Sequence, residues 1–336
     1  MAEPEVPAGA IYDIGYQHYD GKRLGRAGAV RALYVDGIRS IFGIGRGARA
    51  KLPPLALIGM MLIPALVQSA VTGLAGGMIQ LFTHALYFRT TVFLFGLFCA
   101  FQTPELVTGD AQHRVLALYF SRAVLRYDYV LARVGALATA LFGIGLLPHV
   151  VLLMGTWFSA EHVLTAMHTS LPTIPRIVAG ALAIAVLFST VSITIAAVIK
   201  RRPFATAAIL AFLLLASGVV APLVLTRPDK MRYLVLTSPM IVGDGVTTWI
   251  FDTTSAKQKA DSVAAFEAAL DAEAAKAGPP KTRADSFAQM RRRRHRRDRT
   301  VVQAANLPGL VYLGTMAAFI VIAGGVLTLR YRSIET

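Results

Sequence analysis

The chain has 336 residues, of which 55% are hydrophobic and only 16% are charged, and 34 Lys and Arg against 19 Asp and Glu give a net charge of +15. Soluble domains are about one-quarter charged, so this composition excludes an ordinary soluble protein. The apolar residues are gathered into long blocks, which predicts an all-α polytopic membrane protein.

The N-terminal segment, residues 1–51, carries eight Lys and Arg and has no apolar core of the kind found in a secretory signal. An amphipathic helix is predicted over residues 28–47, followed directly by an apolar block. Its apolar side chains recur at spacings of three, four and seven residues: Val30, Leu33, Tyr34, Ile38, Ile41 and Phe42. An apolar stripe with basic flanks is typical of a helix lying in the cytoplasmic membrane interface. The alternative is a short helix of a soluble N-terminal domain.

Six segments are apolar over the roughly 20 residues that a helix needs to cross a membrane. They cover residues 52–74, 90–108, 134–154, 177–199, 204–225 and 307–329. The domain plan that follows is spans one to five within 52–226, a long loop at 227–306, and span six with a tail at 307–336.

The distribution of basic residues predicts the orientation of these spans. If the six helices alternate in direction, the short segments on one side hold seventeen Lys and Arg, and those on the other side hold two. Because Lys and Arg accumulate in short cytoplasmic connections, both termini are expected in the cytoplasm. This parity puts the 80-residue loop 227–306 outside although it holds 15 Lys and Arg. The loop exceeds the length of about 60 residues within which the charge rule operates. In the alternative, residues 232–251 also enter the membrane, but Asp244 and three Gly or Pro residues make them a poor full span.

The connection between the second and third spans predicts a short cytoplasmic helix at about 109–128. Leu116, Tyr119 and Phe120 share one face of this helix, while His113 and Arg114 lie on another. A helix of this kind can present its apolar face to a groove in a partner protein. The alternative is a solvated linker whose long side chains snorkel along the membrane surface.

The long loop has two parts of different composition. A soluble helix is predicted at 255–277, and an arginine-rich run follows at 291–299. The run lacks the interleaved aromatic residues that stack on bases, so we expect it to meet solvent or anionic lipid headgroups and not nucleic acid.

Several classes of site are disfavoured by the residues available. The single cysteine, Cys99, excludes an intrachain disulfide and a cysteine-based metal site. His149, His162 and His168 fit no ligand spacing, so no metal site is predicted. The predicted spans contain one carboxylate, Glu105, whereas an ion-coupled secondary transporter usually has a carboxylate at mid-depth. The chain also lacks the phosphate-binding loop with which ATPases of the P-loop class bind ATP.

Several stretches resemble the permease subunits of type-2 ABC exporters. The match at the second-span exit and coupling helix rests on Pro104-Glu105-Leu106-Val107, Leu116-Ala117-Leu118-Tyr119-Phe120-Ser121-Arg122, Arg126-Tyr127-Asp128-Tyr129 and Ala132-Arg133. Residues 13–26, and Thr237-Ser238-Pro239-Met240 with Asp244-Gly245, are similar to a subgroup common in high-GC bacteria. Ala123 stands where that subgroup usually has proline, and residues 252–306 look like an insertion.

The resemblance implies a membrane subunit that works as a homodimer in the bacterial cytoplasmic membrane, among membrane lipids. Two separate ATPase subunits would bind ATP and Mg²⁺, so this chain would hold no cofactor and would not itself be an enzyme. Coupling to the ATPase would fall to Glu105, Asp110, Gln112, His113, Arg114, Leu116, Tyr119, Phe120, Arg122 and Arg126, with Glu105 and Asp110 anchoring the docking segment. The cargo path would lie between the first, second and fifth spans of the two copies, whose apolar character favours an amphiphilic or hydrophobic cargo. The alternative is a membrane scaffold, without transport, whose basic outer loop binds anionic partners.

Overall fold

The computed structural model describes residues 25–76, 81–113, 115–121, 124–220, 223–224, 231–251 and 307–332. All regular elements in these ranges are helices, which confirms the all-α class. Several predictions lie outside the described residues: the helix at 255–277, the arginine-rich run at 291–299, nearly all of the motif at 13–26, and the side chains of Arg114, Arg122 and Ala123.

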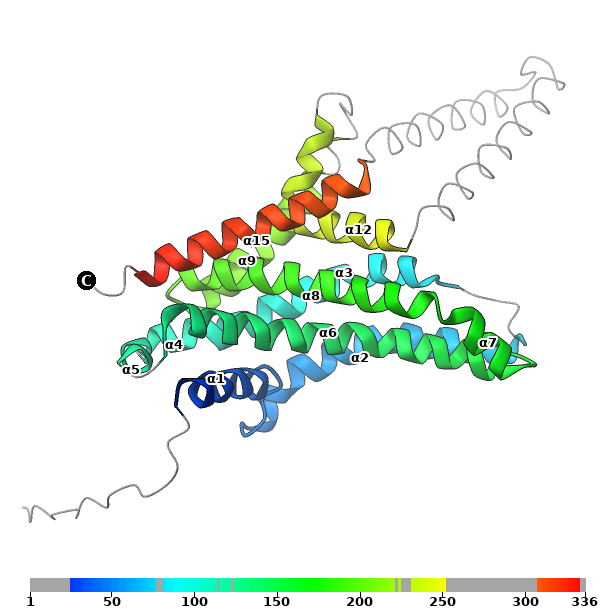
Figure 1. Ribbon diagram of the computed structural model, residues 1–336, viewed down its shortest axis with the longest axis horizontal. Coiled ribbons are helices and arrows are strands. Elements are labelled where there is room, and N and C mark those ends of the chain that lie inside the picture. Colours follow the sequence, from blue (N-terminus) through cyan, green and yellow to red (C-terminus); the bar gives the residue numbers. More distant parts are fainter. Residues whose placement is uncertain are drawn as a thin grey trace, which may run out of the picture.

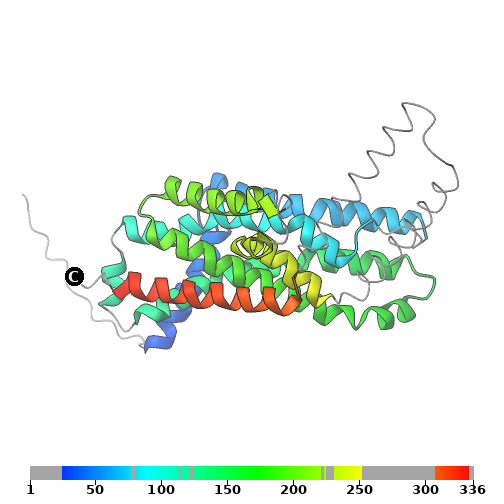
Figure 2. The same ribbon diagram turned by 90° about the horizontal axis from the view of Figure 1, so that it is seen from above.

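Among the described residues, five helices are long and apolar enough to cross a membrane, as expected of a multi-pass membrane protein. They are Ala48–Leu74 (α2), His84–Gln112, Arg126–Phe158 (α6), Thr173–Val198 (α8) and Gly309–Arg332 (α15). The second of these consists of α3 (His84–Thr103), the π-helix η1 (Pro104–Thr108) and α4 (Gly109–Gln112). These helices lie side by side along the length of the molecule (Figures 1 and 2). They account for five of the six predicted spans.

Two short helices lie in the bundle in place of the predicted fifth span, residues 204–225. Helix α9 (Arg202–Gly218) has 17 residues, which is shorter than the roughly 20 that a spanning helix needs. Helix α12 (Pro239–Ile250) begins near the point where α9 ends, because the hydroxyl oxygens of Ser217 and Ser238 are 2.8 Å apart. A 3₁₀ helix, η2 (Arg232–Thr237), precedes α12.

The sequence assigns residues 231–251 to a long external loop. In the structure they instead include helix α12, which is packed in the bundle. Helix α12 packs against α3, α8, α9 and α15, and its Val242 and Val246 are buried in the main core. The segment is too short and too rich in Gly to look like a span, but its apolar face suffices for burial between longer helices. A criterion based on the length of an apolar block misses such an element.

The two ends of the bundle can be named after Arg133 and His149. Arg133 on α6 contacts Asp36 on α1, and Tyr331, near the end of α15, packs against Tyr129. At the opposite end, His149 on α6 contacts His84 at the start of α3. Helix α1 and the last turn of α15 thus lie at the same end, which Figure 1 shows on the left. This is the arrangement that an even number of crossings produces.

Helix α1 (Gly25–Ile41) is shorter than the predicted 28–47, and its apolar stripe faces protein. Leu33 and Ile41 are buried, and the other stripe residues, Val30, Tyr34, Ile38 and Phe42, are half-buried against the core. The stripe packs on α6 and η1. The position of this helix at the membrane interface stays a prediction. Hydrophobic periodicity identifies the apolar face of a helix but does not distinguish a lipid surface from a neighbouring helix.

Close packing between α1 and α6 depends on Gly37. A Cβ atom at this position would lie 2.7 Å from Cβ of Ala136, which is closer than carbon atoms approach without displacement. We expect Gly37→Ala to lower the free energy of unfolding by about 1–3 kcal/mol through overpacking. Gly59→Ala, on α2 with no atom within 4 Å of the new methyl group, is the control and should be neutral or stabilising. Thermal unfolding of both variants in detergent measures the difference, and equal stability would contradict the close-packing argument.

Candidate functional site

At the Arg133 end, Glu105 connects three parts of the fold. Its Oε2 atom accepts a hydrogen bond from Nη1 of Arg202, at the start of α9, at a distance of 2.5 Å. Its Oε1 atom accepts from Arg46, in the turn after α1. Gly109 leaves room for the guanidinium of Arg202, because a Cβ atom at position 109 would lie 2.6 Å from Nη2 of the arginine. The carboxylate predicted to anchor the coupling segment is thus bound by two guanidinium groups.

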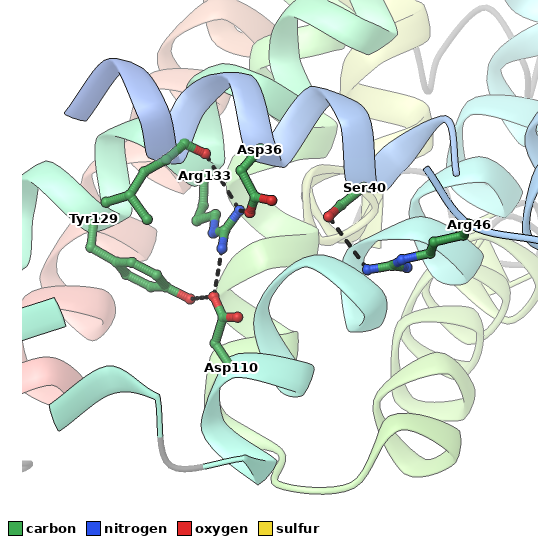
Figure 3. Close-up of polar contacts among 7 residues, drawn as sticks. Asp36, Ser40, Arg46, Asp110, Tyr129 and Arg133 are labelled. Atoms are coloured by element: carbon green, nitrogen blue, oxygen red, sulfur yellow. Dashed lines mark hydrogen bonds and ion pairs between the residues drawn. The ribbon is translucent and has the colours of Figure 1, made fainter. Parts of the chain in front are cut away.

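Asp110 belongs to a group, centred on the buried Arg133, that we name the Arg133 network: Asp36, Asp110, Tyr129 and Arg133 (Figure 3). Oδ2 of Asp110 accepts from the Tyr129 hydroxyl at 2.8 Å and from Nη2 of Arg133 at 2.7 Å. Nη1 of Arg133 donates to Oδ2 of Asp36 at 3.0 Å. The side chain of Arg133 is only 3% exposed, so these two carboxylates neutralise a charge that has little access to water. The network joins α1, α4 and α6.

A second ion pair ties the first turn of α1 to the first turn of α6. The guanidinium of Arg26 donates to both carboxylate oxygens of Asp128, at 2.8 and 2.9 Å, and also to the hydroxyl of Tyr127. Asp128 also accepts from the backbone N–H of Leu125 at 3.0 Å, so it caps the N-terminus of α6, where a negative charge is favourable. The hydrogen bond with Asp128 raises the pKa of Arg26 above its ordinary value, and the group is a cation at all relevant pH values.

The continuous helix predicted at 109–128 is replaced by two short helices and an extended connection. Helix α4 ends at Gln112, α5 spans Leu116–Phe120, and α6 begins at Arg126. Leu125 has an extended backbone, and the cap provided by Asp128 restarts the helix there. The predicted coupling segment therefore contains the two short helices α4 and α5 before the start of α6.

The apolar face of α5 points into the bundle. Leu116 is buried, and the rings of Tyr119 and Phe120 lie 6.1 and 6.2 Å from the ring of Tyr129. Phe120 also contacts the ring of Tyr331, which brings the end of α15 into this cluster. Burial raises the pKa of the Tyr119 phenol, so this group stays neutral. The face that the sequence predicts for a partner is used inside the fold.

A different set of residues of α4 and α5 faces outward. We name it the α4–α5 surface, and it consists of Gln112, His113, Ala117, Leu118 and Ser121. Leu118 is 65% exposed at the centre of α5. Figure 1 places α4 and α5 at the extreme Arg133 end of the bundle, where a partner can reach them.

The ten residues predicted to couple the chain to an ATPase thus fall into groups that differ in burial and contacts. Glu105 and Asp110 are bound by arginines, and Gln112 and His113 are exposed. Leu116, Tyr119 and Phe120 face inward, and the guanidinium of Arg126 lies over the Phe120 ring at 5.7 Å from its centroid. Arg114 and Arg122 lie outside the described residues.

Five residues of the site are absent from the sequence-based candidates: Asp36, Arg46, Tyr129, Arg133 and Arg202. One signal was available for Arg133, which directly precedes a predicted span and so needs a partner near the apolar region. Its carboxylate partner Asp36 is 97 residues away in the chain, and no sequence pattern links the two.

The opposite end of the bundle contains two further polar pairs. Nδ1 of His149 lies 3.0 Å from Nδ1 of His84, so His149 pairs across the bundle with a histidine of α3. Arg89 lies 3.6 Å from a carboxylate oxygen of Asp244, on α12. Within the described ranges, His, Cys, Asp and Glu form no group of three that could hold a metal ion.

No protein-family model matches the chain, and a comparison with curated proteins found no match.

Proposed function

We propose that this chain is the membrane-spanning subunit of an ATP-driven ABC exporter. It works as a homodimer in the bacterial cytoplasmic membrane, with the Arg133 end in the cytoplasm, and docks separate ATPase subunits there. The observation that carries the proposal is the α4–α5 surface, which is exposed at the tip of the bundle while its base is bound to surrounding helices through Glu105 and Asp110.

A docking segment transmits movement only if it is rigidly connected to the helices that must move. Asp110 is bound to α6 through Arg133, and Glu105 is bound to the start of α9 through Arg202. Helix α4 is also continuous with α3 through the π-helix η1, and π-helical turns occur often at functional sites. A displacement of the α4–α5 surface would therefore be passed to α3, α6 and α9 together.

The charge of the Arg133 end supports its cytoplasmic location. The basic residues of the turn before α2, of the start of α9 and of the end of α15 lie at this end: Arg46, Arg49, Lys51, Arg201, Arg202, Arg330 and Arg332. Lys and Arg of short connections remain preferentially on the cytoplasmic side.

The outer faces of the bundle are consistent with lipid, a second copy and an apolar cargo. Helix α2 exposes a row of large apolar side chains, namely Leu52, Leu55, Met60, Ile63 and Leu66. Apolar surface of this extent is compatible with a hydrocarbon environment and with helix–helix contact in a dimer.

Co-purification with a partner tests the proposal. The chain is co-expressed with a candidate ABC ATPase, extracted in mild detergent, and analysed by size-exclusion chromatography and by ATP hydrolysis. We expect a complex of two chains with two ATPase subunits, in which hydrolysis is faster than in the free ATPase. Failure to form a complex, together with unchanged hydrolysis, would contradict the proposal.

Deletion of residues 252–306 separates the exporter from the membrane scaffold. Phe251, the residue before the deleted segment, stacks on His84 at the His149 end, opposite the α4–α5 surface. An exporter should keep its stimulated ATP hydrolysis after the deletion. A scaffold acting through the basic loop would lose binding of its anionic partner and would show no ATPase coupling before or after.

A further inference from the structure

A groove of about 770 Å³ runs between α1 and α6 near the Arg133 end. Val30 and Tyr34 line it from α1, and Leu131 and Gly135 line it from α6, so most of its wall is apolar. Arg26 and Arg31 also line the groove. Its size is within the range of small-molecule sites, and its wall combines an apolar channel with guanidinium groups.

The groove has a polar end and an apolar end along α6. Arg26 contacts Asp128, in the first turn of α6, and the hydroxyl of Tyr34 is hydrogen-bonded to Thr139, eleven residues further along, at 2.9 Å. Leu131 and Gly135 lie between these levels, where the apolar span of α6 begins. The groove therefore runs from the charged start of the helix toward the part that crosses the membrane.

Arg31 differs from Arg26 in how its charge is compensated. The guanidinium of Arg26 is bound by both oxygens of Asp128. Arg31 is exposed, and among the described residues it has no hydrogen bond or ion pair. The groove thus carries one cation more than its own carboxylate neutralises.

We propose that this groove binds one anionic phospholipid of the cytoplasmic leaflet. The phosphate would lie against Arg31, and an acyl chain would follow Val30, Leu131 and Gly135 toward the membrane interior. A lipid fits both features at once, because it carries a negative charge for Arg31 and a hydrocarbon chain for the apolar wall. The inference rests on the cytoplasmic placement of the Arg133 end in the proposed function, but it requires neither an ATPase nor transport.

The test is native mass spectrometry of the full chain, released from detergent containing phosphatidylglycerol or phosphatidylcholine with identical acyl chains. We expect one phosphatidylglycerol to be retained per chain in preference to phosphatidylcholine. Arg31→Ala should weaken this binding about five-fold, the effect of one basic residue near an anionic membrane surface. Arg39→Ala, on the same helix and exposed but outside the groove, is the charge-matched control and should retain the lipid.

A second pair of variants tests the apolar part of the groove. Ala27 lines the groove and Ala32 does not, and both are exposed on α1, so Leu at either position should leave the fold intact. Ala27→Leu should reduce retention of phosphatidylglycerol, and Ala32→Leu should not.

Four results would overturn the proposal. The first two are equal retention of the two lipids, and equal loss of phosphatidylglycerol binding in Arg31→Ala and Arg39→Ala. The third is binding of glycerol 3-phosphate as tight as that of the whole lipid, and the fourth is increased lipid binding after removal of residues 1–24. The last would show that the chain's own N-terminal segment fills the groove. None of these results bears on whether an ATPase docks at the α4–α5 surface, so failure of the lipid-binding proposal is distinguishable from failure of the proposed function.

Discussion

Replacement of Arg133 by methionine is expected to lower the free energy of unfolding by about 3–5 kcal/mol, the usual cost of removing one partner from a buried ion pair. The substitution keeps much of the side-chain volume but leaves the carboxylate of Asp110 without its guanidinium partner. Asp36, the other partner, is 58% exposed and can be solvated by water, so the cost arises mainly at Asp110. Denaturant titration of the purified chain in detergent micelles measures the loss.

Two further variants attribute this loss to the ion pair. Arg39→Met removes an exposed arginine from α1, outside the groove, and should change stability by no more than about 0.5 kcal/mol. In Arg133→Met combined with Asp110→Asn, the unpaired charge is absent, and part of the stability should return. Equal effects of Arg133→Met and Arg39→Met would show that the Arg133 network does not hold α1, α4 and α6 together.

Leu118→Asp is expected to weaken binding of the ATPase subunit by about 30-fold or more while leaving the membrane bundle folded. Leu118 is 65% exposed at the centre of the α4–α5 surface, so a carboxylate there meets water in the free chain. In the complex the same carboxylate would be buried in the interface, where loss of a central apolar residue costs 2 kcal/mol or more, roughly 30-fold in affinity. Binding of the purified ATPase to the immobilised chain, and stimulation of its ATP hydrolysis, report the effect.

Leu164 and Leu116 provide the comparison. Leu164→Asp places the same charge on an exposed leucine of α7 (Val163–Ser170), which packs with α6 beyond the His149 end, and should bind the ATPase normally. Leu116→Asp buries a carboxylate in the core and should prevent folding instead of docking. If Leu118→Asp binds as tightly as the unaltered chain, the ATPase does not dock on this surface.

The predicted coupling segment shows what helical periodicity can and cannot predict. The spacing of Leu116, Tyr119 and Phe120 correctly indicates that these residues share a face. The structure turns that face toward Tyr129 and Tyr331, which come from two other helices. Periodicity defines the apolar side of a helix, whereas the neighbour that covers it depends on contacts distant in the chain.

The same limit applies to helix α12. Asp244 and three Gly or Pro residues make residues 232–251 a poor span, and the sequence therefore favours a loop. In the fold, α3, α8 and α15 surround α12, so a 12-residue helix is buried in the bundle next to the end of α9.

The sequence by itself determined the all-α class, five helices long and apolar enough to span a membrane, and the positions of the carboxylates Glu105 and Asp110 near the end of the second of these apolar blocks. These are local properties, because the length of an apolar block and the charge at its end are read from consecutive residues. Only the tertiary structure decided that α1 packs on α6, that Asp110 is bound by Arg133, that Glu105 is bound by Arg46 and Arg202, and that Leu118 and not Leu116 faces outward. Each of these depends on which helix lies beside which, and packing among side chains far apart in the chain selects that arrangement.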